Sequence, residues 1–216
     1  EAREAIARTL GMITMIDDAV GTVLGAVAKG GLVDKTVLSF TSDHGDLLGD
    51  HGLMFKGPMH YRSLIRVAFV WKDVGGDPCV ARSGELAQTI DIGATVLARA
   101  GIEAYDGMQG RVLLAAMKGA SDAAPDAILI EEEQQGAVLG FGRPTRVRTL
   151  VSDRHRLSVF SAATWGELYD LQKDPLETTN LWSDPASEGL KGRLMALLAV
   201  EMMRHEDESP APTTLA

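Results

Sequence analysis

The sequence has little of three things: cysteine, net positive charge and long apolar runs. One cysteine among 216 residues cannot form a disulfide within the chain, so the fold does not depend on an oxidising compartment. The net charge of -9 argues against nucleic acid or an anionic membrane surface as a partner, because either is normally met by a basic patch. We find no apolar run that predicts a membrane span and no signal peptide. The compartment stays open, since the sequence starts at Glu1 without a methionine.

The composition, 45% hydrophobic and 24% charged, predicts a globular chain with a sizeable core, as one large domain or two small ones. Apolar residues spaced by three and four predict a helix from Ala2 to Lys29, and we expect this helix to pack on a sheet. The runs Val37 to Phe40 and Leu64 to Trp71 are typical of buried strands. Further helices are predicted over Glu85 to Ala100 and, as a short piece, over Gly110 to Lys118.

A second pattern begins after a segment of small residues, Ala120 to Asp126, which we interpret as a boundary. Short strands in sequence predict a small antiparallel sheet, because consecutive strands joined by short loops pair as a meander. These strands are Ala127 to Glu132, Thr145 to Ser152, His155 to Phe160 and Glu167 to Leu171. A closing helix is predicted over Ser187 to His205. The predicted organisation is therefore an α/β region at 1–120, a subdomain at 121–205 and a disordered tail at 206–216.

The segment Val37 to His60 holds the candidate chemistry. Asp43 and His44 directly follow a predicted strand, at the end of a strand where ligand-binding groups collect in open α/β sheets. A carboxylate beside an imidazole suits a divalent cation, with calcium or magnesium favoured by the oxygen and manganese or zinc by the nitrogen. The alternative is a polar turn that binds nothing. We interpret the bases Arg154, His155 and Arg156 as a solvated strand face.

The run TSDHGDLLGDHGLMFKG resembles the metal-binding signature of the sulfatases, a branch of the alkaline phosphatase superfamily. Further similar segments follow the family's order: MITMIDDAVG, LIRVAFVW, TIDIGATVLARAGI and GELYDLQKDPLETTNLW. Together they resemble only the C-terminal part of a sulfatase. The resemblance implies an α/β fold: part of an alkaline-phosphatase-like doubly wound sheet, followed by a small C-terminal antiparallel β subdomain and a closing helix.

The resemblance also implies roles for individual residues. Asp43 and His44 would bind a divalent metal, with Ca²⁺ favoured and Mn²⁺ or Mg²⁺ as alternatives, and Lys56 would contact the oxygens of a sulfate ester. His51 and His60 are candidates for orienting a ligand or the anion, or for a purely structural role.

Sulfatases carry a formylglycine nucleophile made from a Cys or Ser in the pattern C-x-P-S-R or C-x-A-x-R. The run from Cys79 to Ser83 has its arginine one place early and follows the metal motif, so we interpret Cys79 as a loop residue. The nucleophile expected in the intact protein is therefore absent from this chain.

Three functional hypotheses follow. The chain is the C-terminal portion of a hydrolase that cleaves small sulfate esters with a metal, and is inactive alone because the nucleophile and the family's N-terminal metal ligands are missing. Alternatively, the intact protein is a phosphonate monoester or phosphodiester hydrolase of the same superfamily. The third possibility is a non-catalytic binding or assembly module. Exposed sheet edges and apolar faces would favour self-association of the isolated chain.

Overall fold

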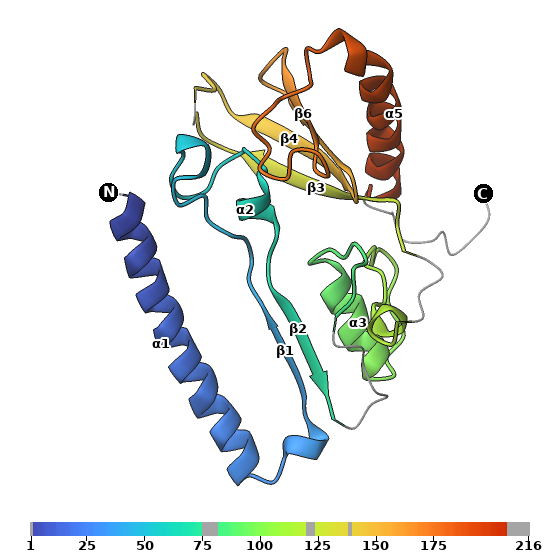
Figure 1. Cartoon of the computed structure of the whole chain (residues 1–216). Helices are drawn as coiled ribbons and strands as arrows, with labels where there is room; N and C mark the ends of the chain where they lie inside the picture. Colours follow the sequence, from blue (N-terminus) through green and yellow to red (C-terminus); the bar gives the residue numbers. More distant parts are fainter. Residues whose placement is uncertain (1, 75–81, 120–123, 138–139, 207–216) are drawn as a thin grey trace, which may run out of the picture. The chain divides into compact units, whose positions relative to one another are not determined.

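The computed structural model describes residues 2–74, 82–119, 124–137 and 140–206 (Figure 1). The chain divides into two compact units, Glu1–Pro78 and Cys79–Ala216, and each is described here by itself. Cys79, the segment 120–123 of the predicted boundary and the tail from 207 onward lie outside the described residues. The predicted domain limits therefore stay predictions.

The N-terminal unit contains one long helix and one pair of antiparallel strands. Its elements are α1 (Ala2–Lys29), the 3-10 turn η1 (Val33–Lys35), β1 (Val37–Thr41), the 3-10 turn η2 (Asp50–Gly52), α2 (Arg62–Ile65) and β2 (Phe69–Asp73). β1 and β2 pair with Ser39 opposite Trp71. The strand predicted from Leu64 was wrong in its first residues, because Leu64 and Ile65 both donate their amides to the carbonyl of Tyr61 and form α2. A short apolar run does not distinguish a buried strand from a buried helical turn.

The helix α1 forms as predicted, but its packing does not. None of its residues is buried, and Leu10, Ile13 and Met15 are 58%, 53% and 71% exposed. The expectation that α1 packs on a sheet is therefore not met within the described part of the chain. By length and composition alone, α1 is also the one described helix that could cross a membrane, contrary to the sequence expectation. Core helices of soluble proteins and signal sequences meet the same criterion.

The C-terminal unit is built around a four-stranded antiparallel sheet in the order β3-β4-β5-β6, which confirms the predicted meander. Its elements are α3 (Asp91–Arg99), α4 (Leu114–Met117), β3 (Ala127–Gln134), β4 (Thr145–Ser152), β5 (His155–Phe160), β6 (Gly166–Asp170), the 3-10 turn η3 (Pro185–Ser187) and α5 (Glu188–Arg204). α5 contacts β3, β4 and β5 and covers one face of the sheet (Figure 1). Alternate strand residues point to this face and form the apolar core, with Leu129, Leu150, Leu157, Leu168, Leu194 and Leu198 among its members.

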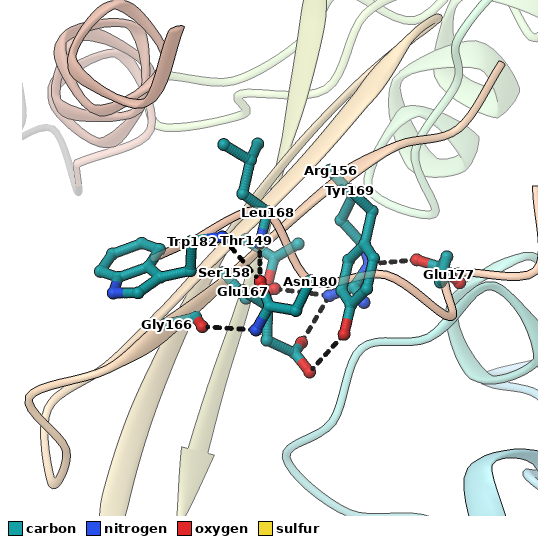
Figure 2. A network of polar contacts seen from close by, with 10 residues as sticks. All are labelled: Thr149, Arg156, Ser158, Gly166, Glu167, Leu168, Tyr169, Glu177, Asn180 and Trp182. Carbon is teal, nitrogen blue, oxygen red and sulfur yellow. Dashed lines mark hydrogen bonds and ion pairs between the residues drawn. The ribbon is translucent and has the colours of Figure 1, made fainter. Parts of the chain in front are cut away.

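The loop after β6 is fastened to that strand by two side chains. Asn180 accepts a hydrogen bond from the amide of Leu168 and donates one to the carbonyl of Gly166, both at 3.0 Å (Figure 2). Trp182 packs over Gly166, where a Cβ would overlap the indole ring. Gly166 is therefore required for a close approach between the loop and the strand.

The loop is also held by a buried ionic network on β5 and β6, shown in Figure 2. Arg156 is 1% exposed and forms ion pairs with Glu167, at 2.8 Å, and with Glu177. Its guanidinium carbon also lies 4.7 Å from the ring centroid of Tyr169. Burial alone would lower the pKa of Arg156, but the two carboxylates raise it above its usual value. The interpretation of Arg156 as part of a solvated face was wrong, because two acids distant in sequence compensate its charge.

Candidate functional site

The candidate site begins just after β1 ends at Thr41. Asp43 and His44 follow the strand, and the next residue, Gly45, donates its amide to the carbonyl of Leu64 at 2.7 Å. A Cβ at Gly45 would overlap the carbonyl oxygen of Ser63. The close approach to α2 that glycine permits therefore fixes the direction in which the chain leaves Asp43 and His44.

Asp43 is an exposed carboxylate that is held in place by its neighbour. Its Oδ1 accepts the backbone N–H of His44 at 2.9 Å, and its Oδ2 lies 3.4 Å from Nε2 of the His44 ring. The backbone hydrogen bond from His44 is the largest cause that lowers the pKa of Asp43 below its usual value. Asp43 is therefore an ionised oxygen donor at neutral pH.

The ring of His44 is oriented by a backbone carbonyl. Its Nδ1 lies 2.7 Å from the oxygen of Gly45, and because a carbonyl can only accept, Nδ1–H is the donor. Nε2 is then the acceptor nitrogen of the ring, because the ammonium group that faces it can only donate. Nζ of Lys56 lies 3.0 Å from Nε2 and donates to it. The carbonyl of Gly45 thus fixes the tautomer that presents Nε2 as an electron-pair donor.

Lys56 reaches His44 at the end of a compact loop. The amide of Leu47 donates to the carbonyl of Phe55 at 2.9 Å, and the amide of Gly49 donates to the carbonyl of Leu53 at 2.8 Å. Non-glycine residues at positive φ in this loop are Leu48 (46°), His51 (53°) and Phe55 (64°). Such conformations cost about 1–3 kcal/mol each and persist where surrounding contacts hold them, often at functional sites.

The structure brings together three of the five predicted site residues: Asp43, His44 and Lys56. His51 is directed elsewhere, onto the ring of Tyr61, with ring centroids 3.6 Å apart and planes 8° apart. His60 is 2% exposed, in the segment that follows Lys56. The contact between His51 and Tyr61 was missed in the sequence, because the two residues lie ten positions apart in irregular chain and no periodicity links them.

The donor set suits a divalent cation but does not complete its coordination. Oδ2 of Asp43 and Nε2 of His44 are electron-pair donors 3.4 Å apart, so one cation could bind both. The single lone pair of Nε2 accepts Lys56 in this structure, so such a cation would replace that hydrogen bond. Among the residues that the structure describes, no group of three or more His, Cys, Asp or Glu side chains could hold a metal ion. A hollow of about 630 Å³ in the C-terminal unit, bordered by Arg82, Glu85 and Asp153 among others, includes none of the predicted site residues.

Comparison with solved structures identifies the fold. The phosphonate monoester hydrolase of Agrobacterium radiobacter matches 95% of this chain with a TM-score of 0.85 and 26% identity, over 42% of its own length. A phosphonate monoester hydrolase from Silicibacter pomeroyi matches 89% of the chain with a TM-score of 0.75 and 24% identity, over 40% of its length. These likenesses confirm the predicted fold class, part of an alkaline-phosphatase-like α/β fold with a small antiparallel subdomain.

Curated relatives define the class of protein. A multifunctional alkaline phosphatase superfamily protein, PehA, from Trinickia caryophylli is 31% identical over 201 residues, which are 88% of this chain and 38% of that protein. An arylsulfatase from Clostridium perfringens is 31% identical over 183 residues, 83% of this chain and 36% of that protein. The chain thus spans little more than a third of these relatives. Its class is a sulfatase-like C-terminal region.

The family follows from residues 49–204, which match the model for N-sulphoglucosamine sulphohydrolase, C-terminal. The chain belongs to this family, and the predicted sulfatase resemblance is confirmed. The matched range includes Lys56, His51 and His60. It begins after Asp43 and His44, so the metal roles of these two residues are not part of the match.

Proposed function

We propose that the chain is the C-terminal portion of a metal-dependent hydrolase of sulfate esters. In this proposal Asp43 and His44 contribute two of the metal ligands, and Lys56 contacts the sulfate oxygens. The observation that carries the proposal is the convergence of Asp43, His44 and Lys56 within hydrogen-bonding distances at the end of β1. The carboxylate of Asp43 and the imidazole of His44 suit a cation that binds the oxygens of an anionic ester, and the ammonium group of Lys56 suits the same oxygens.

Each residue has a distinct task. When bound, the metal would polarise an ester oxygen as a Lewis acid. Asp43 supplies a negative charge, and the lowered pKa of its carboxyl group keeps that group ionised at neutral pH. His44 presents Nε2 because its Nδ1–H is hydrogen-bonded to the carbonyl of Gly45. Lys56 stabilises negative charge that develops on the sulfuryl group or the leaving oxygen, a preorganised contact of the kind that dominates such transfers. The nucleophile and the remaining ligands would come from outside this sequence, so the chain alone is expected to be inactive.

Replacement of Asp43 by alanine tests the metal site. We expect calcium or manganese titrated into the 216-residue chain to release or absorb heat that is lost in Asp43→Ala, because this variant removes the one anionic donor of the pair. Isothermal titration calorimetry measures this directly. Binding should be weak, since a hard cation prefers six or more ligands and the pair supplies two.

A matched control is Asp50→Ala, which removes the same charge from an exposed position in the neighbouring loop. It should titrate like the wild type. Equal heats in the wild type and in Asp43→Ala would favour a non-catalytic assembly module that retained the fold alone.

Replacement of Lys56 by methionine tests the charge-stabilising role in the full-length protein. We expect kcat/KM for an aryl sulfate to fall by about 10²-fold, the usual effect of removing one preorganised donor. Steady-state kinetics measure the change, with Lys35→Met as a control at an exposed lysine outside the site. An unchanged kcat/KM in Lys56→Met would contradict the role.

The second candidate function is hydrolysis of phosphonate monoesters or phosphodiesters. It is supported by the similarity to the Agrobacterium radiobacter enzyme over 95% of the chain. Sulfate and phosphonate esters both present anionic oxygens to a cation and a lysine, so Asp43, His44 and Lys56 suit either. Assays of the full-length protein on matched aryl sulfate and aryl phosphonate substrates separate the two, because the preferred ester should show the larger kcat/KM.

A further inference from the structure

Lys56 lies in a segment of chain whose two ends are joined by a contact between aromatic side chains. His51 and Tyr61 stand five residues before and five residues after Lys56, and their rings stack with centroids 3.6 Å apart. Their contact therefore closes the segment from His51 to Tyr61 into a loop, with Lys56 at its midpoint. From this midpoint the ammonium group of Lys56 reaches Nε2 of His44, a residue that precedes the closed segment.

Both arms of this closed segment are anchored. Before Lys56, the carbonyl of Phe55 accepts the amide of Leu47, a residue that is only 2% exposed. After Lys56, Pro58 and Tyr61 are buried. Lys56 itself is exposed, so its side chain is placed by the backbone on either side rather than by packing around it.

The ring of His51 is aimed at Tyr61 by the backbone. His51 lies in the 3-10 turn Asp50–Gly52 at φ 53°, a left-handed conformation that an L-residue adopts only where other contacts hold it. The amide of Leu53 donates to the carbonyl of Asp50 at 2.9 Å and closes the turn. The imidazole is thereby turned toward the helix start at Tyr61, while His51 as a residue is exposed to solvent.

We propose that His51 and Tyr61 form a clamp that positions Lys56 against Nε2 of His44. His51 is then a positioning residue that acts through the flat face of its ring, and it does not touch the metal or the ester. This inference rests on the proposed function for its purpose: when a cation takes the lone pair of Nε2, a Lys56 already held beside His44 is close enough to turn to the anion that the cation binds. Any flat ring at position 51 should serve, whereas a small side chain should not.

The test compares His51→Ala with His51→Phe in the 216-residue chain. Lysine acylation by an N-hydroxysuccinimide ester, read out by mass spectrometry, reports how tightly each amine is held. We expect Lys56 to be acylated several-fold faster in His51→Ala, because its ammonium group is released from His44, and at the wild-type rate in His51→Phe. Lys35 and Lys72, both exposed and outside the closed segment, should react equally in all three proteins.

A second measurement follows the contact itself. The nuclear Overhauser effect between the Lys56 side chain and the His44 ring should be lost in His51→Ala and kept in His51→Phe. Leu48→Ala is the control for loop strain, because Leu48 also has a positive φ but presents no ring. It should keep both the wild-type acylation rate and the wild-type Overhauser effect.

Three results would overturn the clamp: unchanged Lys56 reactivity in His51→Ala, equal increases in the alanine and phenylalanine variants, or a parallel rise at Lys35 and Lys72. The last would reveal general loosening of the unit. None of these measurements uses a metal or a substrate. If Lys56 responds to His51→Ala as expected but the full-length protein hydrolyses no sulfate ester, the clamp stands and only the proposed function fails.

Discussion

Replacement of Arg156 by leucine should lower the free energy of unfolding of the C-terminal unit by about 3–5 kcal/mol, the cost of breaking a buried ion pair by removing one partner. Glu167 and Glu177 are 2% and 3% exposed, so the variant leaves two buried carboxylates without their shared cation. The cation–π contact with Tyr169 is lost as well. Urea denaturation followed by tryptophan fluorescence measures the effect, since Trp182 packs against β6 in this unit.

A triple variant separates the cost of an uncompensated charge from the worth of the network. Arg156→Leu combined with Glu167→Gln and Glu177→Gln should recover much of the lost stability, because neutral buried side chains no longer require a cation. If the triple variant were as unstable as Arg156→Leu, the loss would come from packing and the ionic account would be wrong.

Arg154→Leu is the matched control, because Arg154 lies two residues before Arg156, in the turn that precedes β5. Arg154 pairs with Asp170 at 3.0 Å, but its side chain is 44% exposed, so the loss should stay below about 1 kcal/mol. The hydrogen bond from Arg154 lowers the pKa of Asp170. A carboxyl with a lowered folded-state pKa stabilises the fold above its unfolded pKa, and this contribution fades as the pH falls through the folded value. The difference between Arg154→Leu and the wild type should therefore vanish in acid.

These two arginines mark where sequence reasoning succeeds and where it fails. Arg156 lies on β5 and Arg154 in the turn before it, and the strands on both sides of that turn were predicted well: β4 and β5 coincide with Thr145–Ser152 and His155–Phe160, because alternation with period two is a strong local signal. The burial of Arg156 was not predicted. Its partners Glu167 and Glu177 lie 11 and 21 residues further along, and no local pattern indicates that they meet it.

The same distinction applies to the candidate site. The order of Asp43, His44 and Lys56 in one motif predicted that they act together, and the structure places them in contact. The support of the site was not predictable, because it comes from Gly45 against α2 and from His51 on Tyr61. Both contacts depend on irregular backbone, for which hydrophobic periodicity carries no information.

The extent of the α1 helix was predicted and its environment was not. Its apolar spacing gives Ala2–Lys29 correctly, since a helical stripe is a property of the segment itself. The surface that such a stripe covers is a property of the whole molecule, and this chain spans 38% of the PehA protein. Within the described part of the chain the apolar side chains of α1 stay exposed, and no pattern in the helix itself indicates which surface would cover them.

Replacement of Gly45 by alanine should disrupt the candidate site and lower the free energy of unfolding of the N-terminal unit by about 3 kcal/mol, the upper range for overpacking. The added Cβ would overlap the carbonyl oxygen of Ser63 and lie 3.2 Å from that of Leu64. Both obstacles are backbone atoms, which cannot move aside as a side chain can. The chain must shift, and the 2.7 Å hydrogen bond from Gly45 to Leu64 should break.

The consequence for the site follows from its position in the chain. Gly45 also supplies the carbonyl that accepts Nδ1–H of His44. A displaced backbone would break this hydrogen bond, so the orientation and tautomer of the His44 ring would no longer be fixed. We therefore expect Gly45→Ala to lose the Asp43-dependent heat of metal binding together with the stability. Urea denaturation followed by circular dichroism measures the stability, and calorimetry measures the metal response.

Gly52→Ala provides the control within the same loop. Gly52 has a positive φ of 72° but no atom within 4 Å of an added Cβ, so its substitution costs only the left-handed backbone, about 1–2 kcal/mol. It should leave the metal response intact, because the amide of Gly52 donates to the carbonyl of Gly49 within the loop and not to His44 or Lys56. If Gly45→Ala cost no more than Gly52→Ala, the close approach of Gly45 to α2 would not support the site.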